Sequence, residues 1–444
     1  MAIDYTYRLR SAHRQGQIAR IAGAISEAEG LIGDIQTVNL TRSQSIREIT
    51  IECRDEEHAD QIAARLDDTD GVTLLWCRNR ALMKHEGGKL TIEPVNPVES
   101  VQHMRDVYTP GVAQACRAIA DDPKKAHDYT MIGRTVAICT NGTRVLGLGN
   151  IGPRASMPVM EGKAVFYRQF AGISAMPILI DTRDVDEFVA TVQRIAPTFG
   201  GIHLEDIEAP ACFDIEERLI ECLDMPVMHD DVHGTAVVTL SAALVGCRRA
   251  EREFEHAVVG QIGLGAAGFG IAALMRGAGA RRVIAADPND AAHARAREEG
   301  IEVVEYDELM READVVVATT GRPGLIAPGD VTKGQIVLAL SNPEPEIDPR
   351  AALEAGAAFA ADGSAVNNVL GYPGIFRGAL LAGAKAIDNP MKVAAAHAIA
   401  ALAEESELVP DVFDPQVHER VAEAVHEAAD ASGASDADRA ATGL

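Results

Sequence analysis

The amino-acid sequence predicts an α/β protein that begins with a small α+β domain. Three patterns lead to this fold class. Residues 1–92 contain strand-like and helix-like segments in the order βαββαβ, residues 100–235 alternate between strands and helices, and residues 236–444 contain a strand, a glycine-rich turn and a helix in succession. Such alternation is typical of a parallel sheet with helices on both faces. We therefore expect three domains with these bounds.

The first domain is predicted from its hydrophobic periodicity. Apolar residues at helical spacing indicate a helix over residues 16–30, and Asp55 is placed to cap a second helix that ends near Leu66. Alternating residues predict strands at 5–10, 35–41, 47–53 and 72–77. This order resembles the ACT domain, a regulatory module that binds small ligands and often pairs between subunits. The resemblance implies a small-molecule effector here, and the alternative is a dimerisation unit without a ligand.

The middle of the chain is predicted to form a parallel sheet after a Pro-containing linker at residues 94–97. Asn141-Gly142 is a strong hairpin signal, so strands are expected on either side of it, at 136–140 and 145–149. Beyond this turn the pattern predicts helices at 164–171 and 185–196 and strands at 177–180, 201–204 and 226–228.

The last third of the sequence is predicted to form a second α/β domain. An apolar helix after Thr235 leads to strands at 257–260 and 282–286, with a helix at 271–275 between them. An alanine-rich helix at 394–403 follows later, and residues 431–444 are expected to fray.

Composition restricts the partners of the protein. The formal net charge is −25, which repels nucleic acid and anionic membranes. Lysine contributes only 8 of the 41 basic residues, a composition typical of proteins kept soluble in concentrated salt, so the sequence favours a halophilic protein over an ordinary acidic one. The seven cysteines contain no C-x-x-C pair, and no signal peptide or apolar run long enough to span a membrane is visible. A cytoplasmic protein is therefore expected.

The pattern G-x-G-x-x-G occurs twice, and only the second occurrence has the context of a dinucleotide-binding turn. The first, at Gly147–Gly152, is followed by Pro153 and Pro158, which we expect to prevent a helix from beginning there. It is predicted to form a tight turn that carries active-site backbone.

The second glycine-rich turn predicts a Rossmann-like, NAD-binding domain. It contains Gly263, Gly265, Ala266, Ala267 and Gly268, follows an apolar strand and begins a helix. Its helix N-terminus can hold the pyrophosphate. Asp287, 19 positions after the last glycine, can accept hydrogen bonds from the ribose hydroxyls. Its charge would repel a 2′-phosphate, which favours NAD over NADP, with Arg281 and Arg282 as the observation that keeps NADP open.

Carboxylates follow two neighbouring strands of the predicted middle sheet. Glu205 and Asp206 follow one strand, and Asp230 and Asp231 follow the next. The carboxyl ends of strands in α/β sheets bind ligands, and hard oxygen ligands suit Mg²⁺ or Mn²⁺. The alternative is zinc held by His229-x-x-x-His233, which the missing Glu and the competing carboxylates disfavour.

Seven segments, in order between residues 100 and 390, resemble the motifs of the malic enzyme family. They are 108–113 (YTPGVA), 145–152 (VLGLGNIG), 158–164 (PVMEGKA), 199–207 (FGGIHLEDI), 229–236 (HDDVHGTA), 341–343 (SNP) and 366–379 (VNNVLGYPGIFRGA). The resemblance implies conversion of malate to pyruvate and CO₂ with NAD(P) and a divalent metal. It also implies a homo-oligomer.

Carried over position by position, the resemblance assigns the site residues. Lys163 becomes the general base and Tyr108 the general acid. The metal ligands become Glu205, Asp206 and Asp231, and the substrate or nicotinamide contacts Asn342, Asn367 and Asn368. Arg144, which precedes the 145–152 segment, is placed to pair with a malate carboxylate, the alternative being a surface charge on a hairpin. A lysine base requires a pKa below its usual range, which we expect burial or the metal to provide.

The sequence departs from the family pattern at three places. The segment before the paired asparagines, residues 361–365, is short, the Asp287-Pro-Asn turn lacks the usual basic or glycine residues, and Val232 stands where Gln is common. Two other functions stay open at this point. One is a malolactic-type decarboxylation without net redox chemistry, and the other is a nucleotide-sensing regulator that has lost catalysis.

Overall fold

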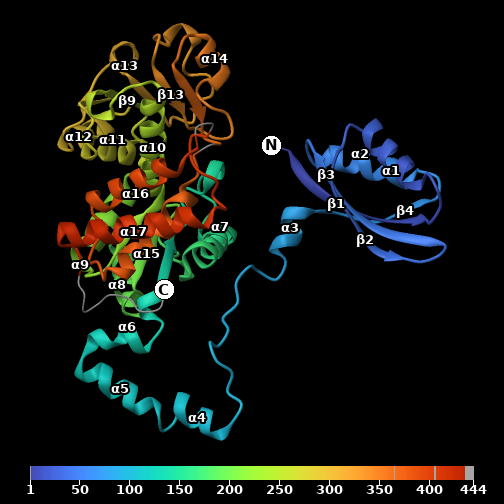
Figure 1. The fold of residues 1–444 in the computed structure, drawn as a ribbon, viewed down its shortest axis with the longest axis horizontal. Coiled ribbons are helices and arrows are strands. Elements are labelled where there is room, and N and C mark those ends of the chain that lie inside the picture. Colours follow the sequence, from blue (N-terminus) through green and yellow to red (C-terminus); the bar gives the residue numbers. More distant parts are fainter. Residues whose placement is uncertain (1, 365, 405–406, 436–444) are drawn as a thin grey trace. The chain divides into compact units, whose positions relative to one another are not determined.

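The computed structural model describes residues 2–364, 366–404 and 407–435, and it divides the chain into two compact units, Met1–Thr91 and Ile92–Leu444 (Figure 1). Each unit is described by itself. The predicted frayed end lies mostly outside the described residues, as does Ala365 in the short segment before the paired asparagines.

The N-terminal unit is a four-stranded antiparallel sheet backed by two helices, so the predicted βαββαβ order is confirmed. The sheet order is β2-β3-β1-β4. Tyr7, Ile25, Ile51 and Ile62 lie in its core. Every residue of edge strand β2 is exposed. The elements are β1 (Ile3–Ala12), α1 (Gln17–Glu27), β2 (Leu31–Leu40), β3 (Gln44–Cys53), α2 (Glu56–Asp67), β4 (Val72–Asn79) and α3 (Arg80–His85).

The second unit contains two parallel sheets. The first has the order β6-β5-β7-β8 and holds the predicted carboxylates at its carboxyl edge. Its elements and those that precede it are α4 (Val101–Val107), α5 (Val112–Asp121), α6 (Ala126–Tyr129), β5 (Thr135–Thr140), α7 (Pro153–Phe166), β6 (Ser174–Leu179), α8 (Val185–Ile195), β7 (Gly201–Leu204), α9 (Ala211–Cys222) and β8 (Val227–His229).

The second sheet has six parallel strands in the order β11-β10-β9-β12-β13-β14, which confirms the Rossmann-like expectation. Its elements are β9 (Val258–Ile262), α11 (Ala266–Gly277), β10 (Arg282–Ala286), α12 (Asp290–Glu298), β11 (Glu302–Val303), α13 (Tyr306–Glu312), β12 (Val315–Ala318), β13 (Ile336–Ala339), α14 (Pro349–Glu354) and β14 (Phe359–Asp362).

Helix α10 (Asp230–Arg249) links the two sheets and runs across the predicted boundary at 235/236, which stays a prediction. It packs against α11 and α16, and its buried face belongs to a core that includes residues from both sheets, such as Val136 and Val259. The remaining helices are α15 (Tyr372–Leu381), α16 (Asn389–Leu402) and α17 (Pro415–Ser432). Short 3-10 helices are η1 (Pro123–Lys125), η2 (Ile132–Arg134), η3 (Leu146–Leu148), η5 (Ala196–Thr198), η6 (Phe254–His256), η7 (Pro328–Asp330) and η8 (Asn368–Leu370), and η4 (Tyr167–Ala171) is a π-helix.

Two local predictions around the first glycine-rich segment are wrong. Strand β5 is followed by no hairpin partner, since it pairs in parallel with β6 and β7, and Val145 forms only an isolated bridge with Gly149. Helix α7 does begin at Pro153. A proline in the first turn of a helix loses no hydrogen bond, because the N–H it lacks has no partner inside the helix. The predicted helix begins at residue 164, directly after Lys163. Because α7 begins at Pro153 instead, Lys163 lies in the last turn of this helix.

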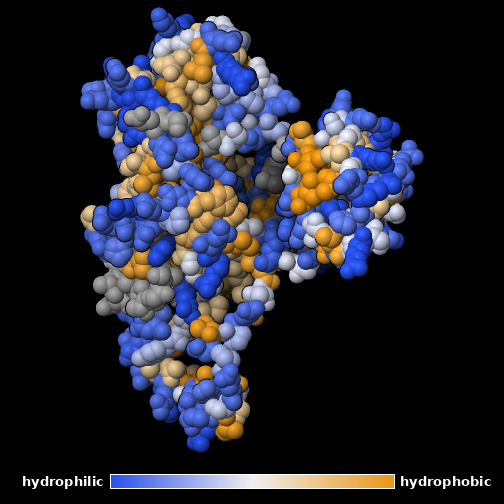
Figure 2. All heavy atoms as spheres, turned by 45° about the vertical axis from the view of Figure 1, so that its right-hand side comes forward, coloured by the Kyte–Doolittle hydropathy of each residue, from blue (hydrophilic) through white to orange (hydrophobic). Residues whose placement is uncertain are grey.

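On the face drawn in Figure 2, most exposed residues are hydrophilic. Within the described ranges, none of the helices is long and apolar enough to cross a membrane.

Candidate active site

Lys163 lies at the centre of the predicted site, enclosed by two carboxylates and an aromatic ring. Its side chain projects from the last turn of α7, and the residue is only 8% exposed. The ammonium Nζ lies 2.5 Å from Asp230 Oδ2 and 3.0 Å from Glu205 Oε1. The ring of Tyr372 lies 4.7 Å from Nζ, within the range of a cation–π contact. These contacts fix the direction of the lysine side chain.

The charge state of Lys163 differs from the sequence expectation. Burial lowers the pKa of Lys163, as predicted, but the negative charges of Asp230 and Glu205 outweigh it and hold that pKa well above its usual value. Burial alone therefore does not give Lys163 the low pKa that a lysine base requires, and the expected contribution of the metal stays a prediction. A lysine in this setting is an ammonium that must lose part of its carboxylate environment before it can accept a proton.

Three carboxylates next to Lys163 form a group suited to a divalent cation. One oxygen from each of Glu205, Asp206 and Asp231 lies within 4.8 Å of the others. Asp231 Oδ2 accepts a hydrogen bond from the Asp206 N–H at 2.9 Å, and Asp206 has a left-handed backbone, with φ of 55°. Three carboxylates this close repel one another, and hard oxygen ligands are those that Mg²⁺ and Mn²⁺ prefer. The donor set fits the predicted ion.

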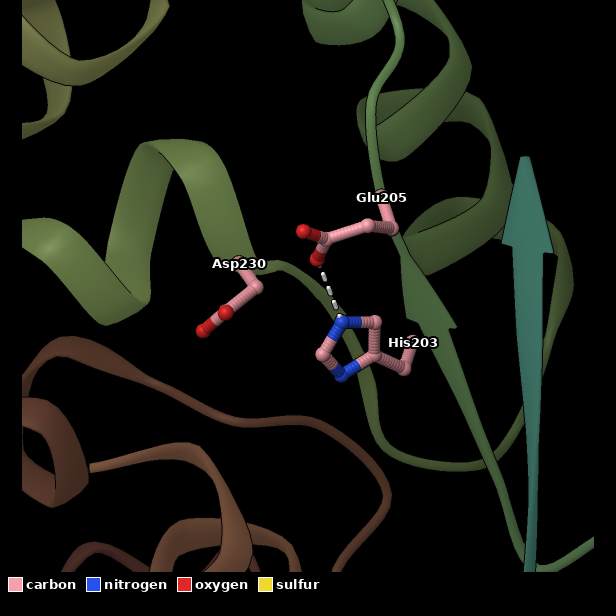
Figure 3. A group of neighbouring side chains, drawn as sticks. All are labelled: His203, Glu205 and Asp230. Carbon is pink, nitrogen blue, oxygen red and sulfur yellow. Dashed lines mark hydrogen bonds and ion pairs between the residues drawn. The ribbon is translucent and has the colours of Figure 1, made fainter. Parts of the chain in front are cut away.

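A second group, His203, Glu205 and Asp230, also converges at this point (Figure 3). Its members already have partners. Asp230 binds Lys163, and His203 Nε2 lies 2.8 Å from Glu205 Oε2 while Nδ1 lies 2.8 Å from the Tyr167 hydroxyl. Burial, helped by the charge of Lys163, lowers the pKa of His203, so the ring is neutral and donates from Nε2 to the carboxylate. His203 thus orients Glu205.

The zinc alternative has no support among the described residues. Neither His229 nor His233 belongs to a group there that could hold an ion. His233 is engaged on both ring nitrogens, by Glu216 and by Lys392.

The sequence motifs assign Asp230 no role, yet its carboxylate lies closer to Lys163 Nζ than that of Glu205 does. It is fully buried, and Asn368 Nδ2 donates to its Oδ2 at 2.6 Å. A glycine four positions later makes room for it, because a Cβ on Gly234 would lie 1.8 Å from Asp230 Oδ1. The pair of adjacent acids before this glycine was the available signal. The Asp230 carboxylate therefore binds both the Asn368 amide and the Lys163 ammonium.

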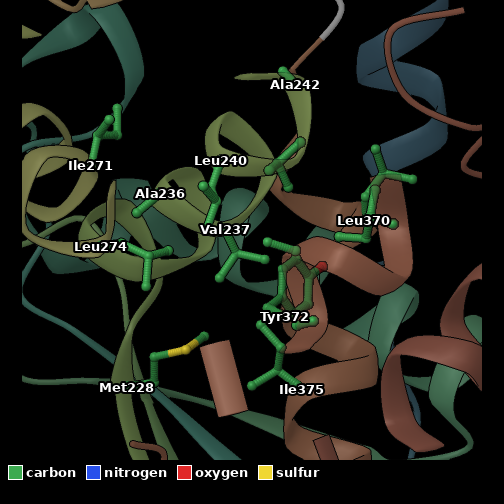
Figure 4. Packing of buried hydrophobic residues seen from close by; sticks show 14 of the residues in the cluster. Met228, Ala236, Val237, Leu240, Ala242, Ile271, Leu274, Leu370, Tyr372 and Ile375 are labelled. Carbon is green, nitrogen blue, oxygen red and sulfur yellow. The ribbon is translucent and has the colours of Figure 1, made fainter. Parts of the chain in front are cut away.

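Packing of helix α10 sets the position of these acids. Leu240 and Val237 of α10 lie near Leu274 of α11 and Tyr372 of α15, whose ring also supports Lys163 (Figure 4). Val232, where the family often has Gln, is buried, and its carbonyl would lie 2.2 Å from a Cβ on Gly270 of α11. The two helices thus approach closely at the base of the site.

A cavity of about 500 Å³ joins the lysine, the carboxylates and the glycine-rich turn. It is lined by residues from both sheets, which are Arg144, Lys163, Glu205, Asp206, Asp231, Gly265, Ala266, Ala267, Gly268, Asn367 and Asn368 among others. The Arg144 N–H donates to the Asp206 carbonyl at 3.1 Å, so the turn after β5 is tied to the turn after β7. Eleven of the predicted site residues thus line one cavity.

The second glycine-rich turn has the geometry of an anion cradle. Gly265 is the N-cap of α11, has no side-chain cap, and would meet nothing within 4 Å if it carried a Cβ. Gly263 has φ of +88°, and a Cβ on Gly268 would lie 2.0 Å from the Gly263 carbonyl oxygen. The turn therefore needs glycine at 263 and 268, and it leaves an uncapped helix N-terminus facing open space, which fits a pyrophosphate.

Asp287 and Gly263 line a second cavity, of about 840 Å³, beside this turn. Asp287 Oδ2 accepts a hydrogen bond from the Leu264 N–H at 2.7 Å, so the carboxylate also holds the glycine-rich turn. Tyr108 and Asn342 line neither cavity. Tyr108 is 69% exposed, and the Asn342 side chain is 3.4 Å from the Gly363 carbonyl. The structure therefore does not bring these two predicted residues to the site.

Comparison with known proteins identifies the family. Residues 88–220 match the model of the malic enzyme N-terminal domain, and residues 242–322 match that of the D-isomer specific 2-hydroxyacid dehydrogenase NAD binding domain. NAD-dependent malic enzyme 1 of Bacillus subtilis is 50% identical over 416 residues, which are 93% of this chain and 95% of that protein. The chain belongs to the malic enzyme family.

Other malic enzymes agree over similar lengths. The NAD-dependent malic enzyme of Geobacillus stearothermophilus is 41% identical and covers 100% of this chain and 98% of its own length. The crystal structure of the malic enzyme from Pyrococcus horikoshii matches with a TM-score of 0.74 and 39% identity, over 78% of this chain and 88% of that one. The resemblance carried by the seven motifs is confirmed.

Proposed function

We propose that this protein catalyses the oxidative decarboxylation of L-malate to pyruvate and CO₂, with reduction of NAD and a requirement for Mg²⁺ or Mn²⁺. One observation carries the proposal. A buried lysine, three clustered carboxylates and the uncapped N-terminus of α11 lie on one cavity, so a base, a cation site and a coenzyme site face the same small space. Membership of the malic enzyme family supports the choice of malate.

The residues of the chain divide the chemistry among them. Arg144 pairs with a malate carboxylate, and Asn367 and Asn368, which line the same cavity, orient the substrate. Lys163 takes the proton of the C2 hydroxyl as hydride moves to the nicotinamide. When bound, a divalent cation polarises the C2 oxygen and offsets the carboxylates that hold Lys163 charged. After CO₂ has left, C3 must gain a proton, and Tyr108 supplies it.

The lining of the second cavity supports a preference for NAD over NADP. Asp287, Asp290 and Glu305 line it and would repel a 2′-phosphate. Arg282, one of the two arginines that kept NADP open, is occupied by Glu302 at 2.7 Å and by Glu312. Arg297 and Arg322 also line the cavity, and they are the groups that would serve NADP if it bound.

A single assay series tests this function and its alternatives. With malate and Mn²⁺, NADH absorbance should appear, and kcat/KM for NAD should exceed that for NADP by more than about 10-fold, which is roughly 1.4 kcal/mol. Pyruvate without this absorbance change would contradict the proposal, as would lactate, the product of malolactic chemistry, or no turnover, the result for a regulator.

Because the net charge is −25, activity and thermal midpoint should rise with KCl toward molar levels. An optimum in dilute buffer would contradict the halophilic expectation.

For Tyr108 to act as the general acid, the segment formed by α4 and Tyr108 must pack against an active site. Val101, Met104 and Val107 of α4 are exposed along with Tyr108, and exposed apolar groups of this kind mark interaction surfaces. We propose that this segment is covered in a homo-oligomer. Tyr108→Phe should still form NADH and CO₂ but slow the conversion of enolpyruvate to pyruvate by about 10²-fold, measured by quench and NMR. Unchanged kinetics would remove the acid role.

A mixing experiment tells whether Tyr108 serves its own chain or a second copy. Equal amounts of Tyr108→Phe and Lys163→Ala chains, refolded together, should regain about a quarter of the wild-type rate of enolpyruvate-to-pyruvate conversion, measured by quench and NMR, if each site takes its tyrosine from the partner in a random dimer. Matched mixtures of each variant with itself are the controls. No gain on mixing would place the tyrosine and the lysine of a site on one chain.

A further inference from the structure

A chain of three polar side chains lies behind the cation site and has no part in the chemistry described above. Glu216 comes from α9, His233 from α10 and Lys392 from α16, so three separate helices meet there. Glu216 and Lys392 are 6% and 7% exposed, and the His233 side chain is 20% exposed. Charged groups at such depth are retained only when they are paired and hydrogen-bonded.

Two consecutive contacts join the three side chains, with His233 in the middle. Lys392 Nζ lies 3.1 Å from His233 Nδ1, and His233 Nε2 lies 3.0 Å from Glu216 Oε2. The other carboxylate oxygen, Glu216 Oε1, accepts the backbone N–H of His229 at 2.7 Å. A lysine ammonium can only donate, so Nδ1 accepts from it and Nε2–H donates to the carboxylate. A neutral imidazole therefore joins an ammonium to a carboxylate.

The charge at the Glu216 end is consistent with this assignment, while burial lowers the pKa of Lys392 at the other end. Burial alone would raise the pKa of Glu216, but His233 and Lys392 outweigh it and lower that pKa to about 2. Glu216 is thus an acceptor on both oxygens at neutral pH. Buried ion pairs add little net stability, because desolvation offsets the attraction. What such a chain does supply is a fixed direction for the groups at its end.

The Glu216 end of this row of three side chains contacts the start of helix α10. His229 is the N-cap of this helix and has no side-chain cap of its own, so the hydrogen bond to Glu216 holds the backbone at the point where the helix begins. The next two residues are Asp230, which contacts Lys163, and Asp231, which belongs to the cation group. A small rotation at His229 would move both carboxylates.

We propose that Lys392, His233 and Glu216 form a positioning relay that fixes the first turn of α10 and so holds Asp231 in place for the divalent cation. The proposal rests on the proposed function, since it concerns the same cation site. None of the three side chains is proposed to touch substrate. Outer contacts of this kind at metal sites typically change metal affinity or activity by about 10- to 100-fold when they are removed.

The test measures Mn²⁺ binding directly, by the EPR signal of free Mn²⁺, without malate or NAD. His233→Ala should raise the Kd for Mn²⁺ by about 10-fold or more. His233→Gln should stay within about 3-fold of wild type, because its amide keeps one acceptor and one donor. Lys392→Met should weaken binding in the same direction, and combining it with His233→Ala should add little, since either change breaks the same relay.

His418→Ala is the matched control, because His418 is a buried histidine of the second unit that lies outside this relay and bonds through Nε2 to the Val412 carbonyl. The relay is contradicted if folded His233→Ala and Lys392→Met bind Mn²⁺ like wild type, or if His418→Ala weakens binding equally. If His233→Ala does not fold, Lys392→Met and the glutamine variant decide. Wild-type protein that binds no Mn²⁺ would instead overturn the proposed function.

Discussion

Replacing Lys163 with alanine should lower kcat for malate oxidation by about 10²- to 10⁴-fold, the range expected for loss of a general base. Lys163 is the basic group that lies between Asp230 and Glu205 on the central cavity, and Arg144, which also lines it, stays protonated. NAD binding, measured by calorimetry, should be unchanged, because the glycine-rich turn keeps its uncapped helix N-terminus. Turnover at the wild-type rate would remove the assignment.

Lys385→Ala is the control for this variant, since Lys385 is exposed and its side chain lies outside both cavities. Lys163→Ala should also destabilise the protein by about 3–5 kcal/mol in the absence of metal, because two buried carboxylates lose their cation. Denaturant unfolding of both variants checks this. Mn²⁺ should restore part of the lost stability in Lys163→Ala, since the ion brings positive charge back to Glu205.

The sequence predicted the parts of the site that depend on local pattern. Glu205 and Asp206 directly follow β7, as predicted, because this strand begins and ends where its apolar run does. The turn from Gly263 to Gly268 was recognised from a strand, three glycines and a helix that are contiguous in the chain. Signals of this kind need no knowledge of distant residues.

The errors arose where a distant partner decides the outcome. Asn141-Gly142 favours a hairpin locally, but β5 gains parallel partners on both edges and Asn141 binds the Thr182 carbonyl. The pKa of Lys163 could not be predicted because its partner Asp230 lies 67 positions away. The contact between His233 and Lys392 spans 159 positions. The hydrophobic periodicity of a sequence gives no information about contacts between residues so far apart in the chain.

Asp231→Asn should separate a cation ligand from an acid that only shapes the turn. Asparagine keeps the volume of the side chain and an oxygen that can accept the Asp206 N–H, but it removes one of three clustered negative charges. We therefore expect the Kd for Mn²⁺ to rise by more than about 10²-fold, measured by EPR, with a matching fall in kcat/KM at low Mn²⁺.

The thermal midpoint of Asp231→Asn is a second measurement. Without metal it should not fall, although the variant binds Mn²⁺ more weakly. Without metal, Asp231→Asn should melt at the wild-type temperature or above it, because the repulsion among the three carboxylates is reduced. With saturating Mn²⁺, the wild type should gain stability as RT ln(1 + [L]/Kd), and the variant should gain much less. Asp214→Asn, at an exposed position on α9, should respond to Mn²⁺ like the wild type. An equal Mn²⁺-dependent shift in Asp231→Asn would mean that Asp231 shapes the turn and that the ion is held without it.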